Sequence, residues 1–146
     1  MVSVSYHDRV NVLQETIAIA PSPFERAEWF ALLAQADQHM LITKAGGTAL
    51  VLAPRGDRIE SLTNWYSFIW KPLGTAALPE LTAIAQSLRG KSHRIVMSPV
   101  PDEDGSAKAL TEAFKEAGWN VTLEKCDHNH VLPTDGRSFA EYWAQR

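Results

Sequence analysis

The apolar positions of this chain fall into short continuous runs and into longer stretches with helical spacing. Two runs, 39–43 and 48–52, flank the Gly46-Gly47 pair. This pair favours a tight hairpin, because both central residues of the preferred turn need positive φ. A second turn at 54–57 leads to a third run at 58–63. The pattern predicts a three-stranded antiparallel meander.

Three other stretches place apolar residues three and four positions apart, as a helix with one buried face does. The first has the clearest start, with Ser22 as N-cap, Pro23 in the first turn and Glu25 closing a capping box. The predicted helices span 23–36, 78–88 and 107–117, with Gly90 stopping the second and Gly118 capping the third.

Further strands are predicted at 10–19, at 94–97 and at 119–123. The run at 94–97 is continuously apolar, as a strand buried on both faces is. We therefore expect an α/β (α+β) fold whose mixed sheet begins with the meander and continues helix-strand-helix-strand, with helices on both faces. The piece 94–123 is either a βαβ crossover or a unit whose last strand inserts as a hairpin.

Bulk properties narrow the class of protein. The 146 residues carry a net charge of -3, and the 14 basic residues are scattered, which argues against nucleic-acid binding. The single cysteine, Cys126, excludes an internal disulfide. No apolar run is long enough for a membrane span and no signal-peptide pattern is present, so we expect a cytoplasmic protein.

Aromatic residues crowd the stretch 64–70, which we expect to be a loop or a short irregular strand. Tryptophan and tyrosine offer rigid contact area with a polar tip. Asn64, Trp65 and Tyr66 are therefore the candidates for a substrate-binding or recognition surface. The alternative, which the sequence favours, is that these rings belong to the core or to a lid over the sheet.

Cys126, His128 and His130 alternate, so on a strand they would share one face and could ligate a metal. Structural zinc sites usually take their ligands as two pairs, so we favour an edge strand that runs into a turn at Pro133.

A second candidate metal site is the acidic run Asp102-Glu103-Asp104, which could bind a divalent cation. The favoured interpretation is that these carboxylates are attracted to a helix N-terminus. Gly46-Gly47 lacks the strand-to-helix setting of a phosphate cradle. Neither a nucleophile elbow nor an H-E-x-x-H motif is present in the sequence.

The chain ends on the start of a helix. Ser138 and Glu141 form an S-x-x-E capping box, but only about two turns follow it. Helices this short are marginal in water. We therefore expect a domain over 1–137 and, over 138–146, the start of a helix that continues beyond Arg146 toward a further domain.

Four stretches resemble the N-terminal part of a bacterial acyltransferase family, the GNAT-fold acetyltransferases of CelD or FemAB-like type. The first is similar to the opening helix of that family, the second to the end of its meander, the third to a helix-to-strand step and the fourth to a helix entry. The stretches are 23–33, 62–67 with 71–73, 113–119, and Leu132-Pro133 with 138–146.

The resemblance implies two joined GNAT-like halves, with acetyl-CoA or another acyl-CoA as cosubstrate of the full-length protein. The C-terminal half would hold it through an R/Q-x-x-G-x-G/A turn at a helix N-terminus. In this chain the nearest approach, 87–92, lacks the second glycine. The resemblance thus implies that the chain binds no cofactor and is a non-catalytic half, partnered by the C-terminal GNAT domain or by a second copy. The alternative is a stand-alone protein-binding or assembly module.

Overall fold

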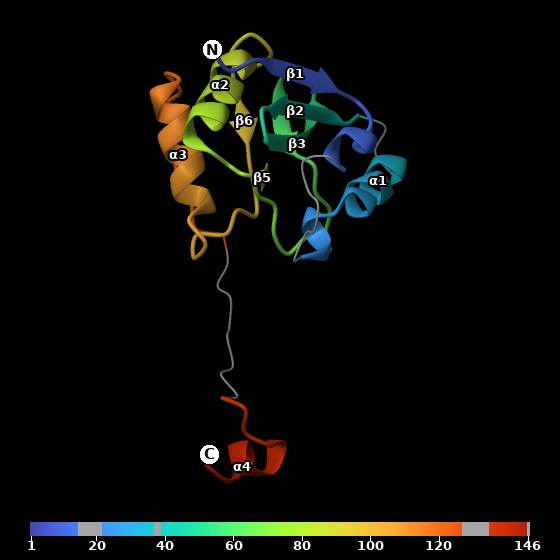
Figure 1. Cartoon of the computed structure of the whole chain (residues 1–146), viewed down its shortest axis with the longest axis vertical. Coiled ribbons are helices and arrows are strands. Elements are labelled where there is room, and N and C mark those ends of the chain that lie inside the picture. Colours follow the sequence, from blue (N-terminus) through green and yellow to red (C-terminus); the bar gives the residue numbers. More distant parts are fainter. Residues whose placement is uncertain (15–21, 37–38, 127–134, 146) are drawn as a thin grey trace.

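The computed structural model describes residues 1–14, 22–36, 39–126 and 135–145. Within these residues six strands form one mixed sheet in the order β1-β2-β3-β4-β6, with β5 beside β3. Figure 1 shows α2 and α3 on one side of the strands and α1 on the other. The predicted α/β architecture, with a mixed sheet between helices, is confirmed.

An antiparallel meander makes up most of this sheet. Each strand pairs with the next: β1 (Val4–His7), β2 (Leu41–Ala45), β3 (Thr48–Arg55) and β4 (Arg58–Ser61). In the β2–β3 turn only Gly46 has positive φ, at +54°, so the expectation for Gly47 is wrong. Positive φ at the first central residue alone is the pattern of a type II′ turn, which also suits a hairpin.

After the meander the chain alternates helix and strand. β5 (Leu73–Gly74) pairs with the start of β3, and α2 (Leu78–Leu88) follows. β6 (Ile95–Val96) then pairs with β4 in parallel, and α3 (Ser106–Glu116) packs against α2. Gly118 caps α3 with φ of +90°, as predicted. The helices at 78–88 and 107–117 are thus confirmed within one residue at their ends.

The N-terminal strand is placed wrongly by the sequence. Val10–Leu13 forms a 3-10 helix, η1, which directs the fully buried Leu13 into the core. The edge strand lies earlier, at β1, where Val4 and Tyr6 pack against the core. Its period-two pattern is only four residues long, too short to stand out from irregular sequence. Residues 15–19 of the predicted strand lie outside the described part of the chain.

The first predicted helix is present in two pieces. Ser22 accepts a hydrogen bond from the Phe24 amide and so caps η2 (Pro23–Glu25), a 3-10 turn. Arg26 is extended, with φ of -84° and ψ of 146°, and α1 (Ala27–Ala36) begins after it. The predictions of Ser22 as N-cap and of Pro23 in the first turn are confirmed, whereas the Glu25 carboxylate lies 3.7 Å from the Lys71 ammonium and no capping box is recorded at η2. The continuous helix is broken at Arg26.

Two strand predictions in the second half need correction. β6 is only partly buried, because among the described strands β4 alone lies beside it. No strand forms at 119–123, since the Trp119 indole donates to the Ala85 carbonyl of α2 at 2.8 Å and docks that segment on the helix. The described residues therefore contain neither the crossover nor the hairpin expected over 94–123.

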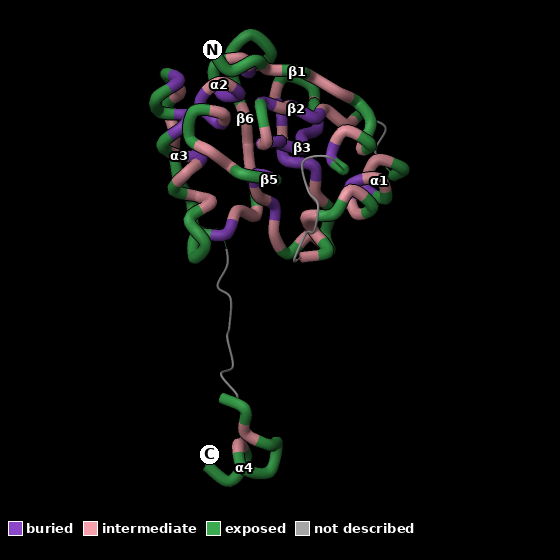
Figure 2. Tube along the Cα trace, viewed as in Figure 1, coloured by how far each residue is buried: buried purple, intermediate pink, exposed green. Residues whose placement is uncertain are grey.

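The core lies between the meander and its helices. Six successive residues of β3, from Thr48 to Ala53, are buried, and Figure 2 shows this strand at the centre of the buried region. From α2 the fully buried residues are Leu81, Ile84, Ala85 and Leu88, and from α1 Phe30 and Leu33 complete the core. No helix within the described ranges is long and apolar enough to cross a membrane.

The C-terminal helix α4 (Phe139–Ala144) stands apart from this body in Figure 1, and none of its residues is buried. The predicted capping box is present. Ser138 accepts from the Glu141 amide at 3.3 Å, and the Glu141 carboxylate accepts from the Ser138 amide at 2.8 Å. These hydrogen bonds hold the pKa of Glu141 below its usual value.

Candidate functional site

The aromatic loop, residues 62–72 between β4 and β5, carries the three candidate recognition residues. Its first half is a turn, in which the Ser67 amide donates to the Asn64 carbonyl at 3.1 Å. The Asn64 side-chain oxygen accepts from the Tyr66 amide at 2.9 Å. Asn64 is thus committed to shaping the turn, as asparagine often is. The predicted loop is confirmed.

Beyond Asn64 the tip of this loop faces solvent. Trp65, Tyr66 and Phe68 are 99%, 74% and 77% exposed. The interpretation that the sequence favoured, a core or lid position, is therefore wrong for these three rings. It is right for Trp70, which is 1% exposed. Large aromatic side chains in solvent are unusual for a folded domain and often mark contact surfaces.

The loop is anchored at its far end by Trp70. Its indole donates to the Val51 carbonyl at 2.8 Å, and its backbone amide donates to the Pro99 carbonyl at 2.7 Å. The ring is thereby fixed between β3 and the segment that follows β6. With the Asn64 turn at one end and Trp70 at the other, the tip is presented from a fixed base.

A second set of rings supports the loop from the side. Phe68 lies edge-on to Phe24 of η2, with ring centroids 5.5 Å apart, and Phe24 lies edge-on to Trp29 of α1 at 5.2 Å. Such edge-to-face pairs contribute roughly 0.5–1.5 kcal/mol beyond the burial of area. The contact explains the position of η2, since Phe24 joins the N-terminal helical segment to the loop.

Lys71 links the aromatic loop by charge to η2 and to the segment that precedes α3. Its ammonium lies 2.7 Å from the Asp104 carboxylate and 3.7 Å from that of Glu25. The hydrogen bond to Asp104 raises the pKa of Lys71 despite burial. Burial would raise the pKa of Asp104, but hydrogen bonds from Lys71 and the Ser106 amide lower it. Asp104 therefore acts at the start of α3 and in this ion pair.

This arrangement accounts for one residue of the acidic run 102–104. The Asp104 carboxylate accepts from the Ser106 amide at 2.9 Å, in the first turn of α3, so the helix N-terminus interpretation is confirmed for Asp104. Cys126 is exposed, whereas His128 and His130 lie outside the described residues. In the ranges that the structure describes, no three His, Cys, Asp or Glu side chains gather as a metal site would require.

A crevice at the carboxyl ends of parallel strands is the usual ligand site of an open α/β sheet. Here β4 and β6 are the parallel pair, and their carboxyl ends are closed. The Ser61 hydroxyl donates to the Ser98 carbonyl at 2.8 Å and accepts from the Ser98 amide at 3.0 Å. Trp70 covers this end through its bond to Pro99. The carboxyl ends of these two strands are therefore joined by the protein's own hydrogen bonds.

The nearest approach to a pyrophosphate turn, 87–92, lies at the end of α2. The Arg89 amide donates back to Gln86 and the Gly90 amide back to Ser87, as at a helix C-terminus. A helix presents carbonyls there, and anions bind at the opposite end. Its position at a helix C-terminus therefore makes this segment unsuited to bind a pyrophosphate.

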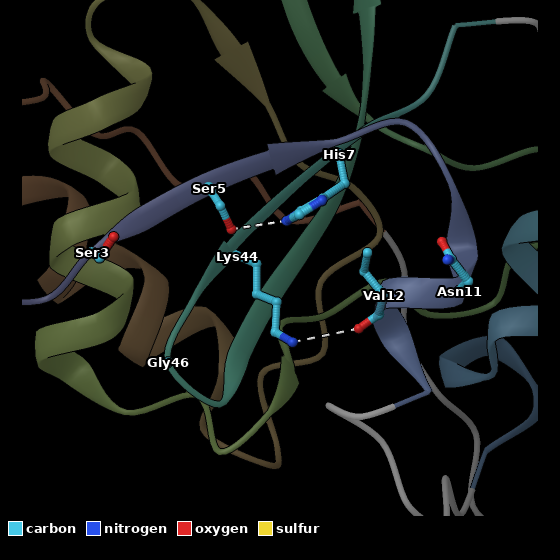
Figure 3. Close-up of a pocket in the computed structure, with 7 residues that line it drawn as sticks. All are labelled: Ser3, Ser5, His7, Asn11, Val12, Lys44 and Gly46. Atoms are coloured by element: carbon cyan, nitrogen blue, oxygen red, sulfur yellow. Dashed lines mark hydrogen bonds between the residues drawn. The ribbon is translucent and has the colours of Figure 1, made fainter.

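A polar depression of about 370 Å³ lies over β1 and β2 (Figure 3). Ser3, Ser5 and His7 line it from alternate positions of the edge strand, and Lys44 enters from β2 opposite Ser5. The Ser5 hydroxyl lies 2.9 Å from His7 Nε2, and Lys44 donates to the Val12 carbonyl at 3.5 Å. The sequence patterns did not predict this depression, although Ser3, Ser5 and His7 alternate along the chain.

Glu80 of α2 forms hydrogen bonds with residues at and near the β2–β3 turn. Its carboxylate accepts from the Thr48 hydroxyl, from the Thr75 hydroxyl at 2.8 Å and from the Gly47 amide at 3.2 Å. The bonds from Thr48 and then Thr75 lower the pKa of Glu80. A Cβ at Gly46 would lie 2.1 Å from this carboxylate, so the turn needs glycine for space as well as for φ.

Comparison with known proteins does not identify a family for this chain. No family model matches the chain, and no curated protein or solved structure matches it either. The aromatic loop and the closed end of the β4–β6 pair therefore carry the functional argument.

Proposed function

We propose that this chain is the non-catalytic, GNAT-like half of an acyl-CoA-dependent N-acyltransferase. The observation that carries the proposal is the carboxyl end of the parallel pair β4 and β6, which the protein's own groups cover. There the Ser61 hydroxyl bridges to Ser98, and Trp70 binds the Pro99 and Val51 carbonyls. A sheet with the layout of a ligand-binding α/β fold but with this end filled by its own side chain suits a supporting domain.

The positions of the resembling stretches support the same proposal. The stretch 23–33 covers η2 and most of α1, and 62–67 with 71–73 covers both ends of the aromatic loop and the start of β5. The stretch 113–119 is the end of α3 and its glycine cap, and 138–145 forms α4. Each therefore lies on an element of the kind that the resemblance implies, except that no strand follows α3 within residues 117–126.

In the whole enzyme an acceptor amine attacks the thioester carbonyl of the acyl-CoA, and backbone amides stabilise the oxyanion. That chemistry belongs to the other half. Trp65 and Tyr66 would contribute from this half by shaping the acceptor side, since both are exposed on a fixed loop. Asn64 acts on the same surface by holding the turn.

The test compares the chain with the protein translated from the uninterrupted reading frame. Calorimetric titration with acetyl-CoA is expected to give no micromolar binding to residues 1–146 and clear binding to the longer protein. Trp65→Ala in the longer protein should lower kcat/KM for the amine, with Leu123→Ala as a matched exposed control. Tight acetyl-CoA binding by the chain alone, or a stop codon after Arg146, would overturn the proposal.

A stand-alone binding module is the second candidate, because Trp65, Tyr66 and Phe68 form an exposed aromatic surface. Aromatic residues in such positions dominate many protein interfaces. The same experiment separates the two candidates, since a module needs neither a second half nor acyl-CoA.

A further inference from the structure

The polar depression over β1 and β2 lies where the core of the sheet ends. Ile42 and Lys44 share one face of β2, because successive side chains of a strand alternate between its faces. Ile42 is fully buried, whereas Lys44 is only half-buried. Ser5 pairs directly with Lys44 across the two strands and is exposed. On this face the apolar packing therefore stops after Ile42, and polar side chains follow it.

The lining of the depression combines positive charge with hydrogen-bonding groups. Its polar residues are Ser3, Ser5, His7, Asn11 and Lys44. Among the described residues that line it, none is acidic. The whole chain has a net charge of -3, so this lining differs in sign from the protein around it. A cation finds no carboxylate among these side chains, whereas an anion meets an ammonium group and several donors.

The pair formed by Ser5 and His7 supplies a donor for a ligand. The Ser5 hydroxyl lies 2.9 Å from His7 Nε2. When Nε2 carries a proton, it donates to the Ser5 oxygen, and the Ser5 hydroxyl can then donate to an acceptor in the depression. An anionic acceptor favours this arrangement most, because hydrogen bonds to charged groups are stronger than those between neutral groups.

Lys44 supplies the positive charge beside this pair (Figure 3). Its ammonium donates to the Val12 carbonyl at 3.5 Å, which is long for a hydrogen bond. An anionic oxygen is a stronger acceptor than a neutral carbonyl at such a distance. The ammonium and the Ser5 hydroxyl therefore approach a ligand from two neighbouring strands, β2 and β1.

We propose that this depression binds a small molecule that carries a phosphate or carboxylate group. Its volume of about 370 Å³ lies within the range of ligand sites, roughly 300–1,000 Å³. Most such sites are mainly apolar, whereas the polar lining found here suits a small hydrophilic ligand. The charged oxygens of the ligand contact Lys44 and Ser5, and its other polar groups contact Ser3 and Asn11. The site does not depend on the acyltransferase proposal.

The first test follows the backbone amide resonances of the full chain by nuclear magnetic resonance at constant ionic strength. Inorganic phosphate and citrate are the two anionic probes, and glycerol is the uncharged control. We expect the amides of Ser5, His7 and Lys44 to shift and saturate with either anion in roughly the millimolar range, as for a small ligand with few contacts. The tighter of the two anions indicates which group the ligand carries. Glycerol should cause no saturable shift.

The second test changes the charge and the hydroxyl separately. Lys44→Met keeps most of the side-chain length without the charge, and it should weaken phosphate binding by at least about tenfold. Lys44→Arg keeps the charge and should bind within about threefold of the wild type. Ser5→Ala removes the hydroxyl and should weaken binding by about three- to tenfold. The matched control is Lys108→Met on α3, at a side chain that is 79% exposed, and it should have no effect.

Circular dichroism checks that the variants fold. If Lys44→Met does not fold, Ser5→Asp places a carboxylate at an exposed position of the edge strand and should abolish binding by repulsion. The proposal is overturned if neither anion gives saturable shifts, or if glycerol binds as tightly as phosphate. Phosphate binding that Lys44→Met or Ser5→Asp leaves unchanged overturns it as well. Millimolar phosphate binding is distinct from micromolar acetyl-CoA binding, so failure here is separate from failure of the proposed function.

Discussion

Trp65 and Trp70 are five positions apart on one loop and have opposite environments. Trp65 is 99% exposed, whereas Trp70 is 1% exposed. The difference lies in the partners within reach. Trp70 meets the Val51 and Pro99 carbonyls, which satisfy both its indole and its backbone amide. Trp65 lies inside the Asn64 turn, where the backbone reverses and directs the side chain away from the sheet.

The comparison shows how one aromatic run combines two roles. Its C-terminal end packs against the sheet, and its tip is exposed to solvent. Burial at one end makes exposure at the other possible, because a fixed base is what keeps the tip from collapsing onto the body. Substitutions at the two ends should therefore have separable effects on stability and on association.

The largest expected effect on the free energy of unfolding is that of Trp70→Ala. Removing a fully buried tryptophan costs about 3–5 kcal/mol in the free energy of unfolding, from lost burial and from the cavity left behind. Urea unfolding followed by circular dichroism measures the change. A domain of ordinary stability would lose much of its folded population at 37 °C.

The matched control is Trp65→Ala, the same change five residues earlier. Its effect on unfolding should stay within about 0.5 kcal/mol, because the side chain is in solvent. If the two variants were equally destabilised, the contrast between the ends of the loop would be wrong. A small effect of Trp70→Ala would have the same meaning.

Trp70→Phe sharpens the comparison by separating ring from hydrogen bond. The Val51 carbonyl also accepts from the Leu62 amide at 3.1 Å, so it keeps one partner when the indole is lost. We expect destabilisation of about 1–3 kcal/mol, from one hydrogen bond and part of the ring volume. A loss as large as that of Trp70→Ala would show that the indole N–H, rather than burial, holds the loop.

Sequence patterns predicted most of the elements that lie in the interior. The hairpin, α2 and α3 have long periodic patterns with glycine or proline at their ends, and these were found. β1 and β6 were missed or misjudged, because short strands at the edges of a sheet have little pattern to read. The strand predicted at 119–123 failed for a tertiary reason, since Trp119 docks on Ala85 instead.

The candidate site was predictable in its residues and not in their roles. The sequence marked Asn64, Trp65 and Tyr66, but it could not tell which aromatic rings face solvent, since a tryptophan has the same composition signal buried or exposed. The pairing of Lys71 with Asp104 joins residues 33 positions apart and follows only from the fold. The closed end of β4 and β6 likewise depends on where Trp70 packs.

Glu80→Gln applies the same comparison, between a side chain with several partners and an exposed one, to carboxylates instead of aromatic rings. Glu80 accepts three hydrogen bonds around the hairpin, and its pKa is lowered from 4.5. Its contribution is therefore full above the unfolded-state pKa and is lost as the pH falls through the lower folded-state pKa. We expect Glu80→Gln to cost about 1 kcal/mol at pH 7, because charged acceptors bind donors more strongly than neutral ones.

Unfolding in urea at several pH values measures this difference, which should shrink below pH 4.5. The control is Glu112→Gln on α3, whose side chain is 53% exposed and pairs with Lys108 at 3.9 Å. This change should cost about 0.3 kcal/mol. A constant difference between wild type and Glu80→Gln across the acid range would show that the clasp does not depend on charge.

Asn64→Ala is expected to change stability less than Glu80→Gln, and it tests whether the tip is held or merely exposed. The substitution removes the acceptor for the Tyr66 amide and should cost about 0.5 kcal/mol, as exposed turn contacts do. Hydrogen exchange at the Tyr66 and Ser67 amides should nevertheless accelerate clearly. Asn64→Asp keeps an acceptor oxygen at the same position and should exchange like the wild type. If both variants exchanged at the wild-type rate, the turn would be set by Trp70 alone, and Trp65 would owe its exposure to the anchored end of the loop.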